Sequence, residues 1–363
     1  MAMLDIFRRI CIIVIERGRT RMDKTVTLED VARAAGVGKG TVDRVLHNRG
    51  RVAEKTRERV LACIEELKYR PNMAARMLAQ KRSYRIAVCF HDLEHEFWEQ
   101  VKEGVDRAAE EYEPMGVQVE PFILPQIDVD SQLAVIRRVV EEKYDGLAIV
   151  PYCAKEISDA LNDAIARGVQ VTTFNNREED VHACYIGLDG LQSGRTAGRL
   201  MSMIASPRSR YIIISAHGSR MRQIDQRAIG FQEVLGAQRP DMVCVGSFVF
   251  EEDFDKVYRF SAEEVPRMGI NAIYATNGCV AVVGKGVAEN GVGAGIRIIG
   301  HDLTPTVVRY LRSGDIDVTI SQEPENQGYL SVQKICRKLL AGEEMEDYYT
   351  RIGIVVSENI AFS

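Results

Sequence analysis

The sequence lacks paired cysteines and long hydrophobic runs. Its eight cysteines, at positions 11, 63, 89, 153, 184, 244, 279 and 336, never form a CxxC pair. A disulfide framework or a cysteine metal site needs clustered residues, so we expect reduced thiols and no metal. The apolar run at residues 10–15 is too short for a signal-peptide core or a membrane span. We therefore expect a cytoplasmic protein that binds no membrane.

Catalytic motifs are also missing. There is no Gly-x-Ser-x-Gly elbow and no HExxH, and the six histidines are scattered. The glycines of GVGAG (residues 291–295) precede a predicted strand, whereas a dinucleotide-binding fingerprint follows one. We expect no cofactor and no enzymatic activity, with a sugar-modifying enzyme as the weaker alternative.

Positive charge is concentrated near the N-terminus. The net charge of −5 divides into +3 for residues 1–21, +6 for residues 22–82 and −14 for the remainder. A small basic segment on an acidic body indicates that only this segment meets a polyanion. Residues 1–21 are either an over-called start or a real N-terminal extension, because the sequence from Met22 onward makes sense alone.

The stretch AAGVGKGTVDRVL (residues 34–46) is rich in glycine but does not fit a nucleotide-binding loop, because no buried strand precedes it. Apolar residues instead recur at helical spacing on both sides of Gly36. Thr27 and Asp30 predict a capping box, and Gly36 predicts a left-handed helix end. With a third helix reaching Leu67, the pattern predicts a helix-turn-helix. A three-helix cap with solvated charges is the plainer interpretation.

The second helix of this pattern has a polar outer face suited to a DNA major groove, formed by Lys39, Thr41, Arg44 and His47. This part of the sequence resembles the DNA-binding head of the lactose-repressor (LacI/GalR) family, without gaps from residue 27 to 78. The matching segments are TLEDVARAAGV, TVDRVL, EKTRERV and LKYRPNMAARML. The resemblance implies that Thr27 and Asn48 approach phosphates and that Lys39, Gly40 and Arg44 read bases. Gly38 and Asp43 replace the family's usual serines, so we expect a different operator sequence.

A short connector follows the head. Pro71 breaks the third helix, and Asn72 can cap a helix of about two turns, which is marginal alone in water. The resemblance implies that two such hinge helices pair in the minor groove, with Ala75 allowing close approach and Leu78 inserted as a wedge. A linker with residual helicity is the alternative.

From residue 84 onward, short apolar runs alternate with helical patterns. Strands are predicted at 86–90, 117–123, 147–150, 169–174, 211–214, 242–245, 272–274 and 296–299. Helices are predicted around 97–112, 131–143, 157–166, 193–204, 226–235, 280–289 and 305–311. This alternation predicts two doubly wound parallel sheets with a cleft between their carboxyl ends.

Polar and aromatic residues follow these strands in an order that resembles the ribose/galactose-type periplasmic sugar-binding fold, which is also the regulatory core of the lactose-repressor family. A sugar ring stacks on aromatic side chains, and its hydroxyls need polar partners. The candidate ligand-binding residues are His95, Phe97, Trp98, Asn175, Asn176, Asp225, Arg227, Asn277, Asp302 and Gln322. Asn176 and Asp225 stand where ribose binders have arginine, so we expect a different sugar or a polyol.

The expected fold class is an all-α helix-turn-helix head plus a two-lobed α/β core like the periplasmic binding proteins. The expected domains are the extension (1–21), the head (22–69), the hinge (70–83) and the core (84–363). The core is expected to have an N-lobe of 84–187 and 323–351 and a C-lobe of 188–322 and 352–363. We expect a homodimeric repressor that binds a pseudo-palindromic DNA operator and responds to a small sugar or polyol. The alternative is a sugar-binding protein whose N-terminal helices serve only for protein interaction.

Overall fold

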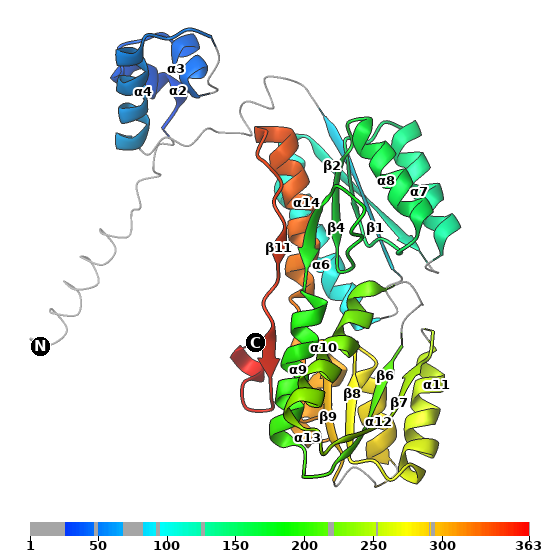
Figure 1. The fold of residues 1–363 in the computed structure, drawn as a ribbon. Helices are drawn as coiled ribbons and strands as arrows, with labels where there is room; N and C mark the ends of the chain where they lie inside the picture. Colours follow the sequence, from blue (N-terminus) through cyan, green and yellow to red (C-terminus); the bar gives the residue numbers. More distant parts are fainter. Residues whose placement is uncertain are drawn as a thin grey trace, which may run out of the picture. The chain divides into compact units, whose positions relative to one another are not determined.

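The structure is a computed structural model. It describes residues 26–46, 50–67, 83–91, 95–124, 128–216, 221–251, 253–289, 291 and 295–362. The chain divides into two compact units: residues 1–79, which include the head, and residues 80–363, which include the core (Figure 1).

The head contains three described helices, α2 (Leu28–Ala34), α3 (Lys39–Leu46) and α4 (Glu54–Glu66). The predicted capping box is confirmed, because Thr27 and Asp30 exchange side-chain and backbone hydrogen bonds at the start of α2. Gly36 has the predicted left-handed backbone, with φ of +61°, and this turns the chain between α2 and α3. Val31, Val42 and Val60, one from each helix, are fully buried in a shared apolar cluster.

The core begins with a six-stranded parallel sheet, which with its helices we call the first lobe. Its strand order is β11-β5-β4-β3-β1-β2. The strands are β1 (Tyr84–His91), β2 (Val117–Leu124), β3 (Gly146–Ile149), β4 (Gln170–Phe174), β5 (Cys184–Gly187) and β11 (Tyr348–Tyr349). Helices α7 (Val129–Glu141) and α8 (Lys155–Ala166) cover one face, while α6 (Glu96–Tyr112) and α14 (Pro324–Ala341) pack together on the other (Figure 1).

The second lobe is built around another six-stranded sheet, of order β12-β10-β9-β8-β6-β7. Its strands are β6 (Arg210–Ser215), β7 (Val243–Val249), β8 (Ala272–Ala275), β9 (Arg297–His301), β10 (Val318–Ser321) and β12 (Gly353–Val355). Helices α9 (Gly190–Ile204) and α10 (Arg222–Gln238) pack on one face, and α11 (Phe254–Arg259), α12 (Val280–Glu289) and α13 (Pro305–Ser313) on the other. Short helical turns at 113–115, 260–264, 265–267 and 360–362 complete the core.

Strands of the second sheet bury alternate residues on opposite faces. Ile212 and Ile273 face α11 to α13, whereas Ile213 and Tyr274 face α9 and α10. Burial on both faces explains why these strands are apolar runs rather than alternating patterns. Among the described strands, the departure from the predicted parallel sheets is β12, which pairs antiparallel with β10 at the sheet edge.

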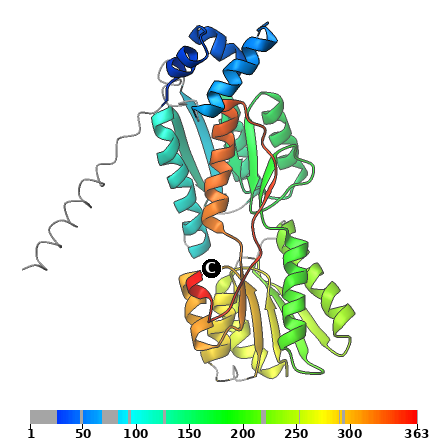
Figure 2. The same cartoon turned by 90° about the vertical axis from the view of Figure 1, so that its left-hand side faces the viewer.

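The chain crosses between the lobes three times: after β5, after β10, and between β11 and β12. Figure 2 shows the two lobes from the side. Both sheets therefore direct the carboxyl ends of their parallel strands toward the region between the lobes, which is where open α/β sheets bind ligands. Within the described part of the chain, we find no helix with the length and apolar character needed to cross a membrane.

Candidate functional site

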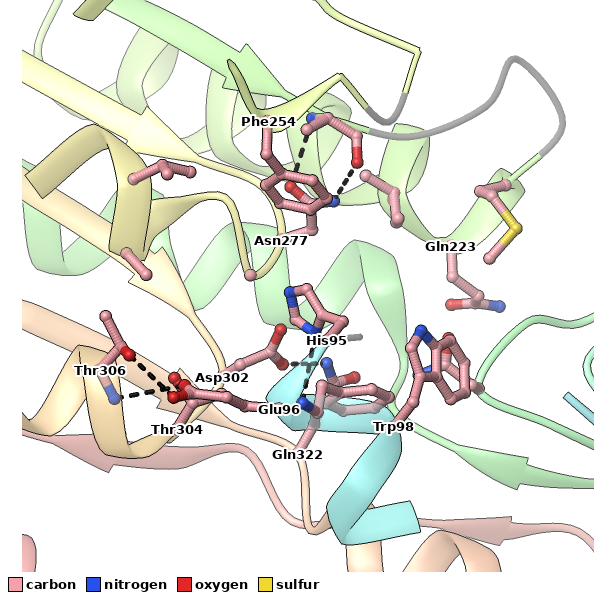
Figure 3. A pocket seen from close by; sticks show the side chains of 18 of the residues that line it. His95, Glu96, Trp98, Gln223, Phe254, Asn277, Asp302, Thr304, Thr306 and Gln322 are labelled. Atoms are coloured by element: carbon pink, nitrogen blue, oxygen red, sulfur yellow. Dashed lines mark hydrogen bonds between the residues drawn. The ribbon is translucent and has the colours of Figure 1, made fainter. Parts of the chain in front are cut away.

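A cavity of ≈ 640 Å³ lies at the strand ends, between the two lobes (Figure 3). This volume is within the range typical of small-molecule sites. Eight of the ten candidate ligand-binding residues line it: His95, Phe97, Trp98, Asn175, Arg227, Asn277, Asp302 and Gln322. They come from both lobes, so a bound molecule would contact both.

A buried chain of hydrogen bonds organises the polar side of the cavity. Arg227, which is 3% exposed, donates to the carbonyl of Thr276 at 2.9 Å and to Gln322 Oε1 at 2.8 Å. Gln322 in turn donates from Nε2 to Asp302 Oδ1. One oxygen of the Asp302 carboxylate is thereby fixed, and its other oxygen is available to accept from a ligand donor.

Asp302 is held in an unusual environment. Burial raises the pKa of Asp302 above its ordinary value, although the nearby Arg227 charge, the hydrogen bond from Gln322 and the neighbouring His95 oppose the change. Its backbone is also left-handed, with φ of +75°. A buried carboxylate and a strained backbone both cost stability, and such costs concentrate at functional sites.

Aromatic side chains form two apolar walls. Phe97 and Trp98 meet edge to face with ring centroids 4.9 Å apart, at the start of α6 in the first lobe. Phe254 is at the start of α11 in the second lobe, and its ring centroid lies 5.4 Å from that of His95. His95 caps α6 by accepting at Nδ1 from the Phe97 amide (3.2 Å), which leaves Nε2 for other partners. The geometry suits a flat molecule with apolar faces and polar edges.

Two candidate residues lie elsewhere. Asn176 is fully buried, and its side-chain nitrogen donates to the carbonyl of Pro151 at 2.7 Å. Its side-chain oxygen accepts from the backbone amide of Gln223 at 3.4 Å. Asp225 is exposed on α10 and is not among the residues that line the cavity. Asn176 thus connects the lobes beside the cavity, and Gln223 takes a lining position that the sequence pattern did not indicate.

Close helix packing sets the position of α10, which carries Gln223 and Arg227. A Cβ atom added at Gly194 of α9 would lie only 2.1 Å from the carbonyl oxygen of Arg227. Only glycine permits this approach, so the sequence GLQSGRTAGR brings α10 close to α9 and directs Arg227 into the site. Asn277 fixes the opposite edge, because it accepts from the Ala216 amide at 3.3 Å and donates to the Ala216 carbonyl at 2.6 Å.

Sequence reasoning also missed several other lining residues, including Glu96, Met221, Phe254, Thr304 and Thr306. Phe254 follows the end of β7 by a few residues, so the strand-end rule that found the other candidates could have identified it. Glu96 is adjacent to His95, but nothing in the sequence reveals that it faces Thr306, more than two hundred residues away.

The head presents the predicted polar face on α3. Lys39, Gly40 and Arg44 are exposed and Thr41 is half-buried, while Val42 and Val45 pack inside. Arg44 donates from Nε to the Gly40 carbonyl (3.0 Å) and from Nη2 to the Thr41 hydroxyl (3.3 Å). The other candidates His47, Asn48, Asn72, Ala75 and Leu78 lie outside the described residues.

Two of the candidate DNA-binding residues have side-chain partners in α2. Lys39 pairs with Glu29 at 2.5 Å, but both side chains are more than half exposed, so the pair is weak and easily exchanged for a phosphate. Thr27 is occupied by the capping box, with its hydroxyl donating to Asp30 at 2.6 Å. The face is accessible, and its arrangement is that of a helix that can enter a groove.

Comparison with known protein families identifies both units. Residues 27–72 match the model described as "Bacterial regulatory proteins, lacI family", and residues 86–344 match the model described as "Periplasmic binding protein domain". The chain therefore belongs to the periplasmic binding protein domain family through its core, and its N-terminal unit carries the DNA-binding domain of the lacI family of bacterial regulatory proteins. This pair of domains is that of LacI-family transcriptional regulators.

Named relatives agree with this assignment. The chain is 23% identical to the HTH-type transcriptional regulator RegA of Clostridium saccharobutylicum over 239 residues, which cover 64% of this chain and 69% of RegA. It is 34% identical to catabolite control protein A of Streptococcus mutans over 125 residues, which span only 34% of this chain and 36% of that protein.

Solved structures show the same core fold. A solute-binding protein from Burkholderia graminis, in complex with D-arabinose, has a TM-score of 0.72 at 19% identity and covers 78% of this chain and 98% of its own. GanP, a glucose-galactose binding protein from Geobacillus stearothermophilus, has a TM-score of 0.67 at 23% identity. The match covers 77% of this chain and 99% of the GanP chain. These four similar proteins are regulators and solute-binding proteins, not enzymes.

Proposed function

We propose that this protein is a transcriptional repressor whose affinity for a DNA operator is controlled by an uncharged sugar or polyol bound between the lobes of its core. The observation that carries the proposal is that one chain combines an exposed helix-turn-helix face with a cavity lined from both lobes. A ligand that prefers one arrangement of the lobes shifts the population toward it by its difference in affinity.

The exposed face of α3 supports specific DNA reading. Arg44 has a guanidinium that can bind guanine O6 and N7 bidentately, and Lys39 can bind the same atoms. The net charge of +6 for residues 22–82 supports the electrostatic part of DNA binding. A regulator of transcription works where DNA is, so we place the protein in the cytoplasm. Binding as a homodimer would match the two half-sites of a pseudo-palindromic operator.

The charges of the cavity support an uncharged ligand. Among the lining residues that the structure describes, Arg227 is the one guanidinium, and two carboxylates, Asp302 and Glu96, line the same cavity. Arg227 is almost fully buried and both of its terminal nitrogens already donate to the protein. A phosphate group would therefore meet no excess of positive charge.

Hydroxyl groups fit these residues better than a phosphate does. They can donate to the free oxygen of Asp302 and accept from the amide side chains of Asn277 and Gln223. The described lining residues include no serine, cysteine or lysine that could act as a nucleophile, and the hydroxyls of Thr304 and Thr306 are engaged in capping α13 and in bonding Glu96. We therefore propose binding without catalysis.

Two experiments test the proposal. Selection from a random duplex library should return a two-fold symmetric sequence bound by the full chain, and an unselective result would refute operator binding. A thermal-unfolding screen against monosaccharides, polyols and their phosphates should show stabilisation by an unphosphorylated compound, because a ligand that binds the folded state raises its stability. Stabilisation by the phosphates alone would refute the proposed ligand class.

A further inference from the structure

The N-terminus of α13 is completed by a residue of the other lobe. Residue Pro305 has no amide hydrogen, and Thr304 caps the helix by accepting from the Val307 amide at 3.3 Å. The Thr306 amide donates instead to Glu96 Oε2, at 3.2 Å, and the Thr306 hydroxyl donates to Glu96 Oε1 at 2.8 Å. Glu96 is in the first turn of α6, in the first lobe, so this hydrogen bonding crosses the cleft (Figure 3).

The surroundings of Glu96 favour a negative charge. The carboxylate is in the first turn of its own helix and against the first turn of α13, so the positive ends of two helix dipoles face it. Partial burial alone would raise the pKa of Glu96, but hydrogen bonds from the Thr304 and Thr306 side chains and from the Thr306 amide lower it below the ordinary value. These donors belong to the second lobe, so the ionised carboxylate is stabilised most when the lobes are together.

Other contacts between the lobes can be compared with that of Glu96. Gln100, one turn further along α6, donates to the carbonyl of Leu303 at 3.2 Å and so reinforces the same edge of the cleft. Another charged contact between the lobes, Arg222 with Glu179 at 2.6 Å, has side chains that are 41% and 61% exposed. An exposed pair of this kind contributes little, because water and salt screen it. Glu96 is therefore the stronger of these two charged links.

We propose that Glu96 is a positioning residue, which holds the core closed by capping α13 from the opposite lobe. Opening the cleft exchanges these charge-assisted hydrogen bonds for bonds to water, which shifts the ratio of closed to open forms by about tenfold. The regulatory meaning of this link rests on the proposed function, because closure matters only if a ligand controls it. The link itself is tested without ligand or DNA.

The test uses the full chain and its single tryptophan, Trp98, which lines the cavity beside Glu96. Acrylamide quenching of Trp98 fluorescence is compared in the wild type, Glu96→Ala, Thr306→Val and Thr306→Ser. Glu99→Gln is the matched control, because Glu99 is in the same first turn of α6 but exposed. We expect stronger quenching in Glu96→Ala and in Thr306→Val, and wild-type quenching in Thr306→Ser and Glu99→Gln. Thermal unfolding of each variant shows that the fold is kept.

Thr306→Val is decisive because it changes the other lobe and leaves the residues around Trp98 intact. Thr306→Val removes the hydroxyl hydrogen bond but keeps the backbone amide, whereas Glu96→Ala removes the acceptor of both. The double variant should therefore quench no more than Glu96→Ala alone, and Thr306→Val should quench less than Glu96→Ala. Quenching that is unchanged in Thr306→Val, or changed only in Glu96→Ala, would overturn the proposal. Failure of the sugar screen with a positive result here would reject the proposed ligand class and leave the link between the lobes established.

Discussion

Replacement of Asp302 by asparagine tests the cavity most sharply, because it should change ligand affinity and stability in opposite directions. Asparagine keeps the size of the side chain, is tolerated in left-handed backbone, and can still accept from Gln322. With its one oxygen on Gln322, asparagine replaces the charged oxygen that faces the cavity by an amide nitrogen, which donates and cannot accept. A hydrogen bond to a charged group contributes about 1.5–3 kcal/mol, so the dissociation constant of a hydroxylated ligand should rise roughly 10- to 150-fold.

Stability at neutral pH should increase in the same variant. The pKa of Asp302 is raised in the folded protein, chiefly by burial, above its value in the unfolded chain. The folded state therefore binds the Asp302 proton more tightly than the unfolded chain does, and this tighter binding stabilises the fold. The stabilisation is complete below the pKa of Asp302 in the unfolded chain and is lost as the pH rises through its pKa in the folded protein. Asparagine never ionises, so Asp302→Asn should unfold at a higher temperature than the wild type at pH 7, with the difference shrinking at acidic pH.

The assay combines thermal unfolding at several pH values with calorimetric titration of the compound found in the sugar screen. Asp302→Gly and Asp302→Ala separate the backbone from the side chain. Alanine in a left-handed conformation costs about 1–2 kcal/mol, so the glycine variant should be the more stable of the two. Wild-type ligand affinity in Asp302→Asn would refute the role of the carboxylate. A lower unfolding temperature at pH 7 would refute the account of its buried charge.

Three further substitutions test other parts of the molecule. Arg44→Ala should lose about 1–3 kcal/mol of discrimination at one base pair of the selected operator, measured by anisotropy, while keeping salt-sensitive non-specific binding; an unchanged base preference would remove Arg44 from readout. Leu78→Ala should reduce DNA bending in a gel-shift assay and spare ligand affinity; undiminished bending would contradict the wedge. Gly194→Ala should destabilise the core by about 1–3 kcal/mol and weaken ligand binding by displacing Arg227. If the variant keeps the ligand affinity and the unfolding temperature of the wild type, the close packing of α9 on α10 does not position Arg227.

Much of the fold was predictable because its signals are local. Each strand and helix predicted for the core from apolar runs is present, with ends that differ by a few residues. The sequence patterns did not predict β5 (Cys184–Gly187), β10, β11, β12, α11 or α14 (Pro324–Ala341). β5 has only four residues, and its burial depends on pairing with β4 and β11. Helix α14 follows a left-handed residue, Glu323, and has a polar first turn, which reads as a loop.

The candidate site was predictable to the extent that it follows strand ends. Asn175, Asn277, Asp302 and Gln322 come directly or almost directly after strands, and parallel strands bring such residues to one edge. The sequence could not distinguish Asn175, which lines the cavity, from Asn176, which binds the carbonyl of Pro151. That difference depends on a left-handed turn at Asn175, with φ of +61°.

Contacts between the lobes were beyond reach of sequence reasoning. Phe254 faces His95, and Glu96 binds Thr306, only because two separately formed sheets meet at a particular angle. Local periodicity carries no information about that angle. The sequence therefore could not show which residues of one lobe meet which residues of the other.

The central claim is that occupation of the cavity controls DNA binding, and one titration tests it directly. Anisotropy of a labelled duplex carrying the selected operator is measured with increasing protein, with and without a saturating concentration of the sugar or polyol from the screen. We predict that the compound changes operator affinity at least about tenfold in the wild type, in the range typical of allosteric coupling, and that Asp302→Asn requires a higher concentration for the same change. Equal operator affinity with and without a compound that demonstrably binds the cavity would contradict the account.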